Sequence, residues 1–219
     1  TEALRTNSGV GMGEASARAV ALLKSVGIED GERRLRQYPH ELSGGLLQRV
    51  MIATALLTQP RLLLAAEPTT ALDVTTQAEV LAILDGLRSK LHLAMLFITH
   101  TLELAAAICD RTVVMYAGQV VEVRESNKLH EQPLHPYTAA LAAARPNIDT
   151  TAHRLTAIPG RPLSAFEAPP DACAFTARCP HVADVCRARR PALVALDGGL
   201  TRCARASELF GKLKVPLNA

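Results

Sequence analysis

Two short apolar runs in this chain of 219 residues are each followed by a side chain that can take part in chemistry. Glu67 ends the run that begins at Arg61, and His100 comes shortly after the run from Ala94 to Ile98. Such runs are typical of buried strands in a parallel sheet, whose carboxyl ends form the edge where ligands bind. A helix-capping carboxylate and a strand-end hydrogen bonder are the simpler interpretations of Glu67 and His100.

A possible anion site precedes the predicted helix from Leu46 to Leu57, which we expect to be capped and largely buried. Ser43, Gly44 and Gly45 stand directly before it. Backbone amides at a helix N-terminus attract anions, and two glycines with a serine hydroxyl make such amides accessible. Taken alone, the triplet is explained more simply as an ordinary helix cap.

Four of the five cysteines lie near the C-terminal end, at Cys173, Cys179, Cys186 and Cys203, and the fifth is Cys109. An odd number of cysteines in a cytosolic chain favours thiols or metal ligands over disulfides. Four soft ligands can hold a metal once they are deprotonated. The spacing lacks the Cys-x2-Cys pairs of structural zinc sites, which disfavours zinc, and thiols that merely pack remain an alternative.

The elements that would position these residues alternate along the chain. The expected helices span residues 14–26, 46–57, 77–91, 102–109 and 136–145, and the expected buried strands span 61–66 and 94–98. Alternating strands and helices predict a parallel sheet wrapped by helices. Residues 111–116 and 119–123 flank Ala117-Gly118, which predicts a terminal hairpin. A proline-rich stretch follows the last helix and is typical of a linker or strap.

Composition places the chain among ordinary globular proteins, with 48% hydrophobic and 21% charged residues. Only 3% of the residues are aromatic and none is Trp, so we expect an aliphatic core. No apolar run reaches the roughly 18 to 20 residues of a membrane span, and the polar start does not resemble a signal peptide. We therefore expect a soluble, cytoplasmic chain. Its excess of basic residues in 171–219 lacks interleaved aromatics, so nucleic acid is not an expected partner.

Four motifs in a fixed order resemble the second half of an ATP-binding-cassette (ABC) ATPase. They are Leu42 to Arg49, the apolar run ending in Glu67, Ala71-Leu72-Asp73 and Ile98-Thr99-His100. By this resemblance, Glu67 is the base that polarises the attacking water and His100 is the switch histidine that reaches the γ-phosphate. Phosphoryl transfer depends on positioning and charge stabilisation, which such groups supply.

The same resemblance assigns a role across a subunit interface to the first and third motifs. Leu42 to Gln48 corresponds to the signature motif, which contacts the nucleotide held by the opposite subunit. Asp73 belongs to the loop that crosses the dimer interface. The residues that would contact nucleotide in trans are Ser43, Gly44, Gly45 and Gln48.

Longer stretches resemble the oligopeptide, dipeptide and nickel importer branch of the family. They are Tyr38 to Leu42, Arg49 to Ala53, Glu67 to Thr75, Val114 to Gly118 and His135 to Thr138. The resemblance implies ATP and Mg²⁺ as cofactors. It also implies two permease subunits, a second related ATPase subunit and a solute-binding protein as partners. The chain would then lie on the cytoplasmic face of the inner or plasma membrane, attached peripherally through the permeases.

The cysteines fit the same branch, because Ile158-Pro159-Gly160 and the spacing Cys173-x5-Cys179-Pro180-x6-Cys186 resemble its C-terminal extension. Cys203 stands where a fourth cysteine is expected. Some members of the branch carry a [4Fe-4S] cluster here, and such clusters use all-cysteine ligand sets. A [4Fe-4S] cluster is therefore the first candidate, a metal-free module the second, and zinc the third.

Two departures from the family pattern concern catalysis. No Gly-x-x-x-x-Gly-Lys-Ser/Thr occurs, so the Walker A loop would precede Thr1 and the chain would be about the C-terminal two-thirds of a family member. Ala66 stands where the Walker B aspartate helps to hold Mg²⁺, and Thr101 replaces the acid that commonly follows the switch histidine. We do not expect this chain to bind ATP usefully by itself, and whether it is an enzyme stays open.

The predicted fold class is α/β: part of a P-loop NTPase (ABC ATPase) core with a helical subdomain and a cysteine-bearing C-terminal extension. The expected segments are a helical subdomain with the signature motif at 1–60, the second half of the ATPase core at 61–125, a helix and proline-rich strap at 126–170, and the extension at 171–219.

The predicted function is that of the ATP-binding, energy-coupling subunit of a peptide-type ABC importer, in a truncated or degenerate form. The alternative is a non-catalytic interaction module that completes a partner ATPase's site through its signature motif. ATP turnover by the purified chain would separate the two. A chromosome-maintenance or repair ATPase shares the signature motif but would need a coiled coil or a strongly basic face, and the sequence has neither.

Overall fold

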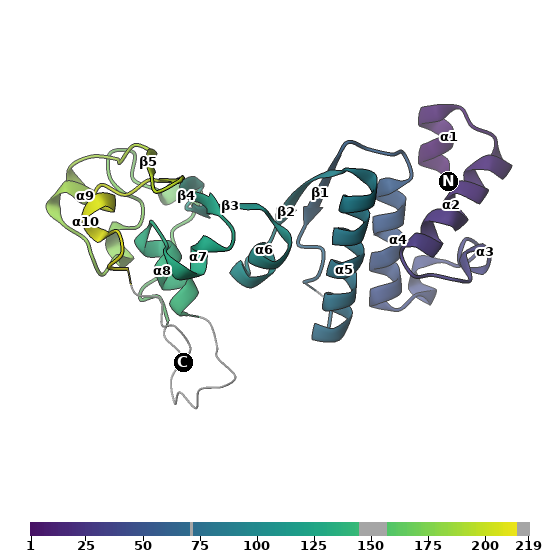
Figure 1. Cartoon of the computed structure of the whole chain (residues 1–219), viewed down its shortest axis with the longest axis horizontal. Helices are drawn as coiled ribbons and strands as arrows, with labels where there is room; N and C mark the ends of the chain where they lie inside the picture. Colours follow the sequence, from purple (N-terminus) through teal and green to yellow (C-terminus); the bar gives the residue numbers. More distant parts are fainter. Residues whose placement is uncertain (71, 145–156, 214–219) are drawn as a thin grey trace. The chain divides into compact units, whose positions relative to one another are not determined.

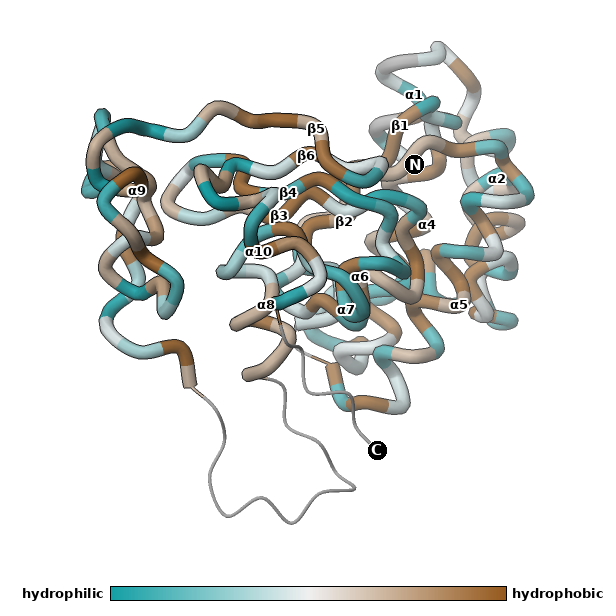
Figure 2. The backbone as a smooth tube through the Cα atoms, turned by 60° about the vertical axis from the view of Figure 1, so that its left-hand side comes forward, coloured by the Kyte–Doolittle hydropathy of each residue, from teal (hydrophilic) through white to brown (hydrophobic). Residues whose placement is uncertain are grey.

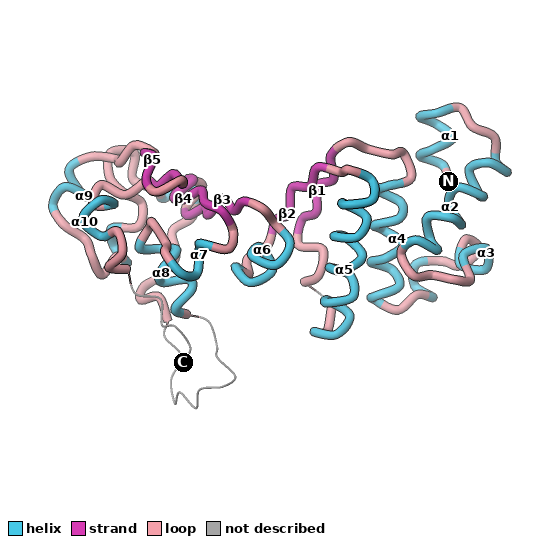
Figure 3. Tube along the Cα trace, viewed as in Figure 1, coloured by secondary structure: helices cyan, strands magenta, loops and turns pink. Residues whose placement is uncertain are grey.

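The computed structural model describes residues 1–70, 72–144 and 157–213, drawn in Figure 1. The chain forms two compact units, Thr1–His100 and Thr101–Ala219. Figure 3 shows that the first unit is mainly helical. Within the described residues, no helix combines the length and apolar character needed to cross a membrane.

Five helices build most of the first unit. They are α1 (Glu2–Ser8), α2 (Met12–Ser25), α3 (Gly31–Arg34), α4 (Gly44–Leu56) and α5 (Val74–Leu91). Helix α2 ends before Gly27, whose φ of 79° lies in the left-handed region that favours glycine, so the predicted helix end is confirmed. Leu4, Ala15, Ala19 and Leu57 form a small aliphatic core between α1, α2 and the end of α4.

Helix α4 begins two residues earlier than predicted, because Gly44 and Gly45 are already helical. The prediction that this helix is largely buried is wrong. Only one stripe of it, at Ile52, Ala53 and Leu56, is buried. The apolar sequence overstated its burial because neighbouring helices cover a single side of it.

The first unit also holds the predicted parallel strands, β1 (Leu62–Ala66) and β2 (Ala94–Ile98). They pair in register from Leu62 with Ala94 to Ala66 with Ile98. The prediction that both strands are buried is wrong for one face. Leu63 and Ala65 are buried, whereas Leu64 and Leu96 keep 64% and 53% of their surface exposed. Only one face of this two-stranded sheet is covered, so β1 alternates between buried and exposed residues and β2 between partly buried and exposed ones.

The second unit is organised around an antiparallel sheet with the strand order β3-β4-β6-β5. Its long strands are β3 (Arg111–Tyr116) and β4 (Gln119–Glu125), and Figure 2 shows hydrophobic residues along both. Ala117 and Gly118 connect them with φ angles of 46° and 73°, as a tight hairpin requires, so the predicted hairpin is confirmed. It is not terminal, because β6 (Gly199–Thr201) pairs with β4 and β5 (Val194–Leu196) pairs with β6.

Short helices surround this sheet. They are α6 (Leu102–Ile108), α7 (Lys128–Glu131), α8 (Pro136–Ala143), α9 (Asp184–Ala188) and α10 (Ala206–Leu209). The expected end of the helix at Arg145 lies outside the described residues, as does part of the proline-rich stretch. Residues 157–170 form irregular backbone with one short turn of helix at Ala165–Glu167.

An aromatic cluster lies within the core of the second unit, whose other buried members are aliphatic, as expected. Tyr116 and Tyr137 both lie against Phe175, each with ring centroids 5.3 Å apart from it. Val114, Val121 and Leu129 complete the buried cluster. The chain has few aromatic residues, and three of them gather at this point, where strand β3, helix α8 and the C-terminal segment meet.

A buried carboxylate joins β4 to the start of α8. Glu122 has no exposed surface, and its two oxygens accept hydrogen bonds from the backbone amides of Leu134 and His135, both at 2.9 Å. Burial raises the pKa of Glu122. His135 is also buried, which lowers its pKa to about 3, and its Nδ1 accepts a hydrogen bond from the amide of Tyr137. The imidazole is therefore neutral and fixes the first turn of α8.

Candidate functional site

Glu67 and His100 meet at the carboxyl ends of the two parallel strands. Glu67 Oε1 lies 3.4 Å from His100 Nδ1, and both side chains are substantially exposed. The amide of Glu67 donates to the carbonyl of Ile98 across the strand pair, at 2.9 Å. The structure thus brings together the two residues that the sequence placed at one sheet edge.

Thr70 is a third member of this site that the sequence analysis did not identify. Its hydroxyl donates to Glu67 Oε2 at 2.9 Å. This hydrogen bond and the contact with His100 lower the pKa of Glu67, so the carboxylate is ionised at neutral pH. Glu67 also has a φ of 46°, which is uncommon for a residue other than glycine. The carboxylate is therefore held in one direction, with an oxygen toward each neighbour.

The triplet of residues 43–45 forms the N-terminus of α4. Ser43 is the N-cap, and its hydroxyl accepts a hydrogen bond from the amide of Leu46 at 3.4 Å, so the predicted cap is confirmed. Gly44 and Gly45 occupy the first two helical positions, where amides have no partner within the helix. Gln48 lies half-buried on the same helix. The geometry is that of a small anion site, and none of these four residues contacts Glu67 or His100 in the described structure.

Asp73 serves as the N-cap of α5. Its Oδ1 accepts from the amide of Thr76 at 3.0 Å, and its Oδ2 accepts from the Thr76 hydroxyl at 2.7 Å. The amide and then the hydroxyl of Thr76 lower the pKa of Asp73. Arg49 of α4 forms an ion pair with Glu79 of α5, so the helices that begin at the triplet and at Asp73 are joined.

These residues do not fit a complete Mg²⁺ site. Magnesium prefers several oxygen ligands in octahedral arrangement. Ala66 offers a methyl group at the end of β1, and the oxygens of Glu67 face Thr70 and His100. The chain's own donors at this edge would need further ligands from outside it.

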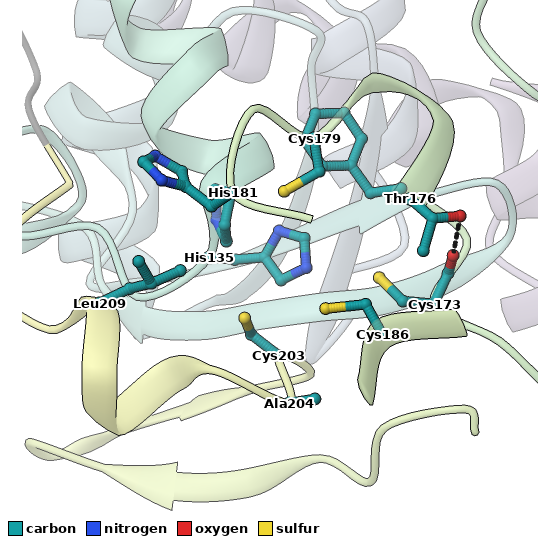
Figure 4. Close-up of a pocket in the computed structure, with 11 residues that line it drawn as sticks. His135, Cys173, Thr176, Cys179, His181, Cys186, Cys203, Ala204 and Leu209 are labelled. Atoms are coloured by element: carbon teal, nitrogen blue, oxygen red, sulfur yellow. Dashed lines mark hydrogen bonds between the residues drawn. The ribbon is translucent and has the colours of Figure 1, made fainter. Parts of the chain in front are cut away.

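The four C-terminal cysteines line one cavity, together with His135, Phe175 and His181. Figure 4 shows their sulfur atoms directed toward this common space. Burial raises the pKa of Cys173 and Cys179, and raises that of Cys203 to about 11, so these thiols are protonated when no cation is bound. Cys109 follows α6 and lies outside this cavity.

The four cysteine thiols are suitable ligands for an iron–sulfur cluster, but the cavity that they line is narrow. The cavity measures about 10 Å³, enough for one water-sized particle. Among the described residues, no three His, Cys, Asp or Glu side chains are arranged to hold a single metal ion. A cluster binds each cysteine through a different iron, so its sulfurs lie farther apart than around one ion. The thiols would have to turn outward to admit one.

Two family models match separate parts of the chain. The model described as "ABC transporter" matches residues 1–70, and the model described as "Oligopeptide/dipeptide transporter, C-terminal region" matches residues 121–186. The first match contains the triplet before α4 and Glu67, and the second contains three of the four clustered cysteines.

Curated relatives cover nearly the whole chain. The oligopeptide transport ATP-binding protein OppD of Salmonella typhimurium is 40% identical over 207 residues, which are 94% of this chain and 62% of the relative. The dipeptide transport ATP-binding protein DppD of Escherichia coli is 44% identical over 203 residues, which are 92% of this chain and 62% of the relative. The chain thus spans about three fifths of the length of these relatives.

The fold agrees with this assignment. The structure of cbiO1 from Clostridium perfringens, part of the ABC transporter complex cbiONQ, superposes with a TM-score of 0.51 at 28% identity. The superposition covers 57% of this chain and 48% of that one, which confirms the predicted α/β fold of an ABC ATPase in part. Over nearly its whole length the chain is therefore similar to the ATP-binding subunits of oligopeptide and dipeptide ABC transporters.

Proposed function

We propose that this chain acts as the ATP-binding, energy-coupling subunit of a peptide import system. The observation that carries the proposal is the contact of Glu67 with His100 at the carboxyl ends of adjacent parallel strands. Relatives named as oligopeptide and dipeptide transport ATP-binding proteins support peptides as the cargo. ATP and Mg²⁺ are the cofactors, and two permease subunits, a second related ATPase subunit and a solute-binding protein are the partners. The site of action is the cytoplasmic face of the membrane.

In this proposal, Glu67 accepts a proton from the attacking water. The Thr70 hydroxyl holds one oxygen of the ionised carboxylate, so that the other remains directed toward His100 at the exposed edge. His100 contacts the terminal phosphate and keeps Glu67 in place through its Nδ1. Both side chains are exposed in this chain, which leaves them accessible to a nucleotide held partly by other segments or subunits.

The N-terminus of α4 supplies the other half of a composite site. Ser43, Gly44, Gly45 and Gln48 bind the nucleotide of the second ATPase subunit in trans, through helix amides and the serine hydroxyl. The loop that ends at Asp73 lies at the interface between the two ATPase subunits. The proposed organisation has four segments: the helical subdomain at 1–60, the ATPase core at 61–125, the helix and strap at 126–170, and the cysteine-bearing extension at 171–219.

Ala66 favours a second candidate function, a non-catalytic module that only completes a partner's site. A methyl group cannot hold Mg²⁺, and the sequence contains no phosphate-loop motif, so the chain's own hydrolytic site is degenerate or depends on segments outside it. This alternative uses the signature residues and leaves Glu67 without a catalytic role.

One experiment separates the two candidates. The purified chain is mixed with a phosphate-loop-bearing ATPase subunit of the same family, and phosphate release and ATP-dependent association are measured. Both proposals expect no hydrolysis by the chain alone and a loss of stimulated turnover in Ser43→Arg. In a chain that keeps Ser43, Glu67→Gln reduces the stimulated turnover only if this chain is itself catalytic. Stimulation that survives Ser43→Arg would contradict both.

We also propose a [4Fe-4S] cluster, with zinc as the second choice, held by Cys173, Cys179, Cys186 and Cys203. Support comes from their common cavity and from the positive charge of Arg205, which is held beside the cavity by a hydrogen bond to the carbonyl of His181 and would offset thiolate charge. Anaerobic preparation should give iron and sulfide in equal amounts, and Cys179→Ser should lose both while Cys109→Ser retains them. Colourless protein with stoichiometric zinc would favour zinc, and metal-free protein would contradict both.

A further inference from the structure

We propose that Thr76 is a positioning residue that fixes the glycines of the α4 N-terminus relative to Asp73. The inference rests on the proposed role of that N-terminus in binding a nucleotide in trans. Thr76 itself lies in the first turn of α5. It acts through two neighbours, Asp73 on its own helix and Gly45 on the next.

The bond to Asp73 fixes the orientation of the Thr76 side chain. The hydroxyl donates to Asp73 Oδ2 and the amide of the same residue donates to Oδ1. A threonine in a helix has two accessible rotamers about its first side-chain bond. The hydroxyl bond to Asp73 selects one of them, and this choice also sets the direction of the Cγ2 methyl group.

That methyl group fills the space beside Gly45. A Cβ built on Gly45 would lie 2.6 Å from Thr76 Cγ2, closer than real Cβ contacts come, while Thr76 Cβ and Oγ1 would be at 3.9 and 4.0 Å. The methyl alone therefore excludes a side chain at position 45. Glycine here is required by close contact with Thr76 and not by an unusual backbone angle.

A second link holds the same pair of helices. Arg49, about one turn after Gly45, forms an ion pair with Glu79, and its other guanidinium nitrogen donates to the carbonyl of Val26 at 3.3 Å. With α4 and α5 joined at this point, the contact of Gly45 with Thr76 sets the position of the first α4 turn. A movement of Asp73 would release the Thr76 rotamer and so shift the amides of Gly44 and Gly45.

The test is a set of four variants: Gly45→Ala, Thr76→Ser, Gly45→Ala with Thr76→Ser, and Gly45→Ala with Thr75→Ser. Serine keeps the hydroxyl of Thr76 and removes Cγ2, so the alanine Cβ then meets only atoms at ordinary contact distance. Thr75 is an exposed threonine next in sequence and serves as the matched control. Each variant is measured by thermal unfolding and by its stimulation of the phosphate-loop-bearing ATPase subunit.

We expect Gly45→Ala to lower the unfolding temperature and to reduce stimulated turnover by on the order of 10-fold. Thr76→Ser should restore both in the double variant, because alanine is a better helix former than glycine once it fits. Thr75→Ser should restore neither. A further variant, Thr76→Val, tests the bond with Asp73 specifically. It keeps a methyl group but lacks the hydroxyl, so the pKa of the Asp73 carboxyl should rise, which NMR titration measures.

Additive effects of Gly45→Ala and Thr76→Ser on both measurements would overturn the inference. Rescue of unfolding without rescue of turnover would also overturn it, because the contact would then be structural only. If the unaltered chain gives no stimulation at all, the proposed function fails, and the unfolding cycle still decides whether Thr76 and Gly45 are coupled.

Discussion

Two side chains, Thr70 and His100, hold the pKa of the Glu67 carboxyl below its usual value. His100 could be predicted, because the ends of neighbouring parallel strands meet at one edge. Thr70 could not, since its hydroxyl reaches Glu67 Oε2 only after the chain turns through the positive φ of Glu67 itself. A threonine three residues after a carboxylate is a common pattern, and only the backbone conformation gives it a partner here.

Thr70→Val should raise the pKa of Glu67 toward its ordinary value, because the hydrogen bond from Thr70 is the largest cause of the lowered pKa. A depressed carboxyl pKa contributes stability above the pKa of the unfolded chain, and this contribution is lost as pH falls through the folded value. The variant should therefore lose less stability on acidification. NMR titration of the Glu67 carboxyl checks the shift, with Thr70→Ser as the control that keeps the bond. Equal pKa values in Thr70→Val and the unaltered chain would contradict this account.

At the scale of elements, apolar runs located the strands and helices but not their covered faces. The runs before Glu67 and His100 predicted fully buried strands, whereas β1 alternates between buried and exposed residues and β2 between partly buried and exposed ones. Strands β5 and β6 have three residues each, too short for any periodic pattern, so their addition to the hairpin could not be predicted. The turn at Ala117-Gly118 could be predicted, because Gly118 favours the positive φ that a tight hairpin requires.

The attachment of α8 to β4 depends on Glu122. In Glu122→Ala the buried amides of Leu134 and His135 lose their acceptors, which should lower the free energy of unfolding by about 2 to 4 kcal/mol. Glu122→Gln keeps one acceptor oxygen and should cost less. Chemical denaturation of the three proteins measures the difference. A Glu122→Ala variant as stable as the unaltered chain would show that water or a relaxed backbone satisfies these amides.

The attachment of α8 to β4 also explains how a residue distant in sequence comes to lie beside the cysteines. His135 carries one of the two amides that Glu122 binds, and its neutral ring lines the cavity with Cys173 and Cys203. The gathering of the four cysteines could be predicted from their number and spacing. The position of His135 at this cavity could not be predicted. It depends on the pairing of β4 with β6, which places the C-terminal segment beside α8.

At the scale of the whole molecule, the sheet of the first unit keeps an apolar face exposed. Parallel sheets are normally covered on both faces, and this chain spans 62% of the length of relatives such as DppD. Leu64 and Leu96 pair in the register of β1 with β2 and are each more than half exposed, so they form the centre of that face. Leu63 points to the covered face and is buried.

These opposite environments predict opposite outcomes for one kind of substitution. Leu64→Gln with Leu96→Gln should change the free energy of unfolding by less than about 1 kcal/mol and should reduce concentration-dependent self-association, because exposed apolar strands promote association. Leu63→Ala should instead cost about 2 to 4 kcal/mol through the cavity it leaves. Denaturant unfolding and light scattering over a range of concentrations measure both effects. If the double variant destabilises the chain as much as Leu63→Ala does, the exposed face must be covered in solution. If self-association is not reduced in the double variant, a different surface is responsible for it.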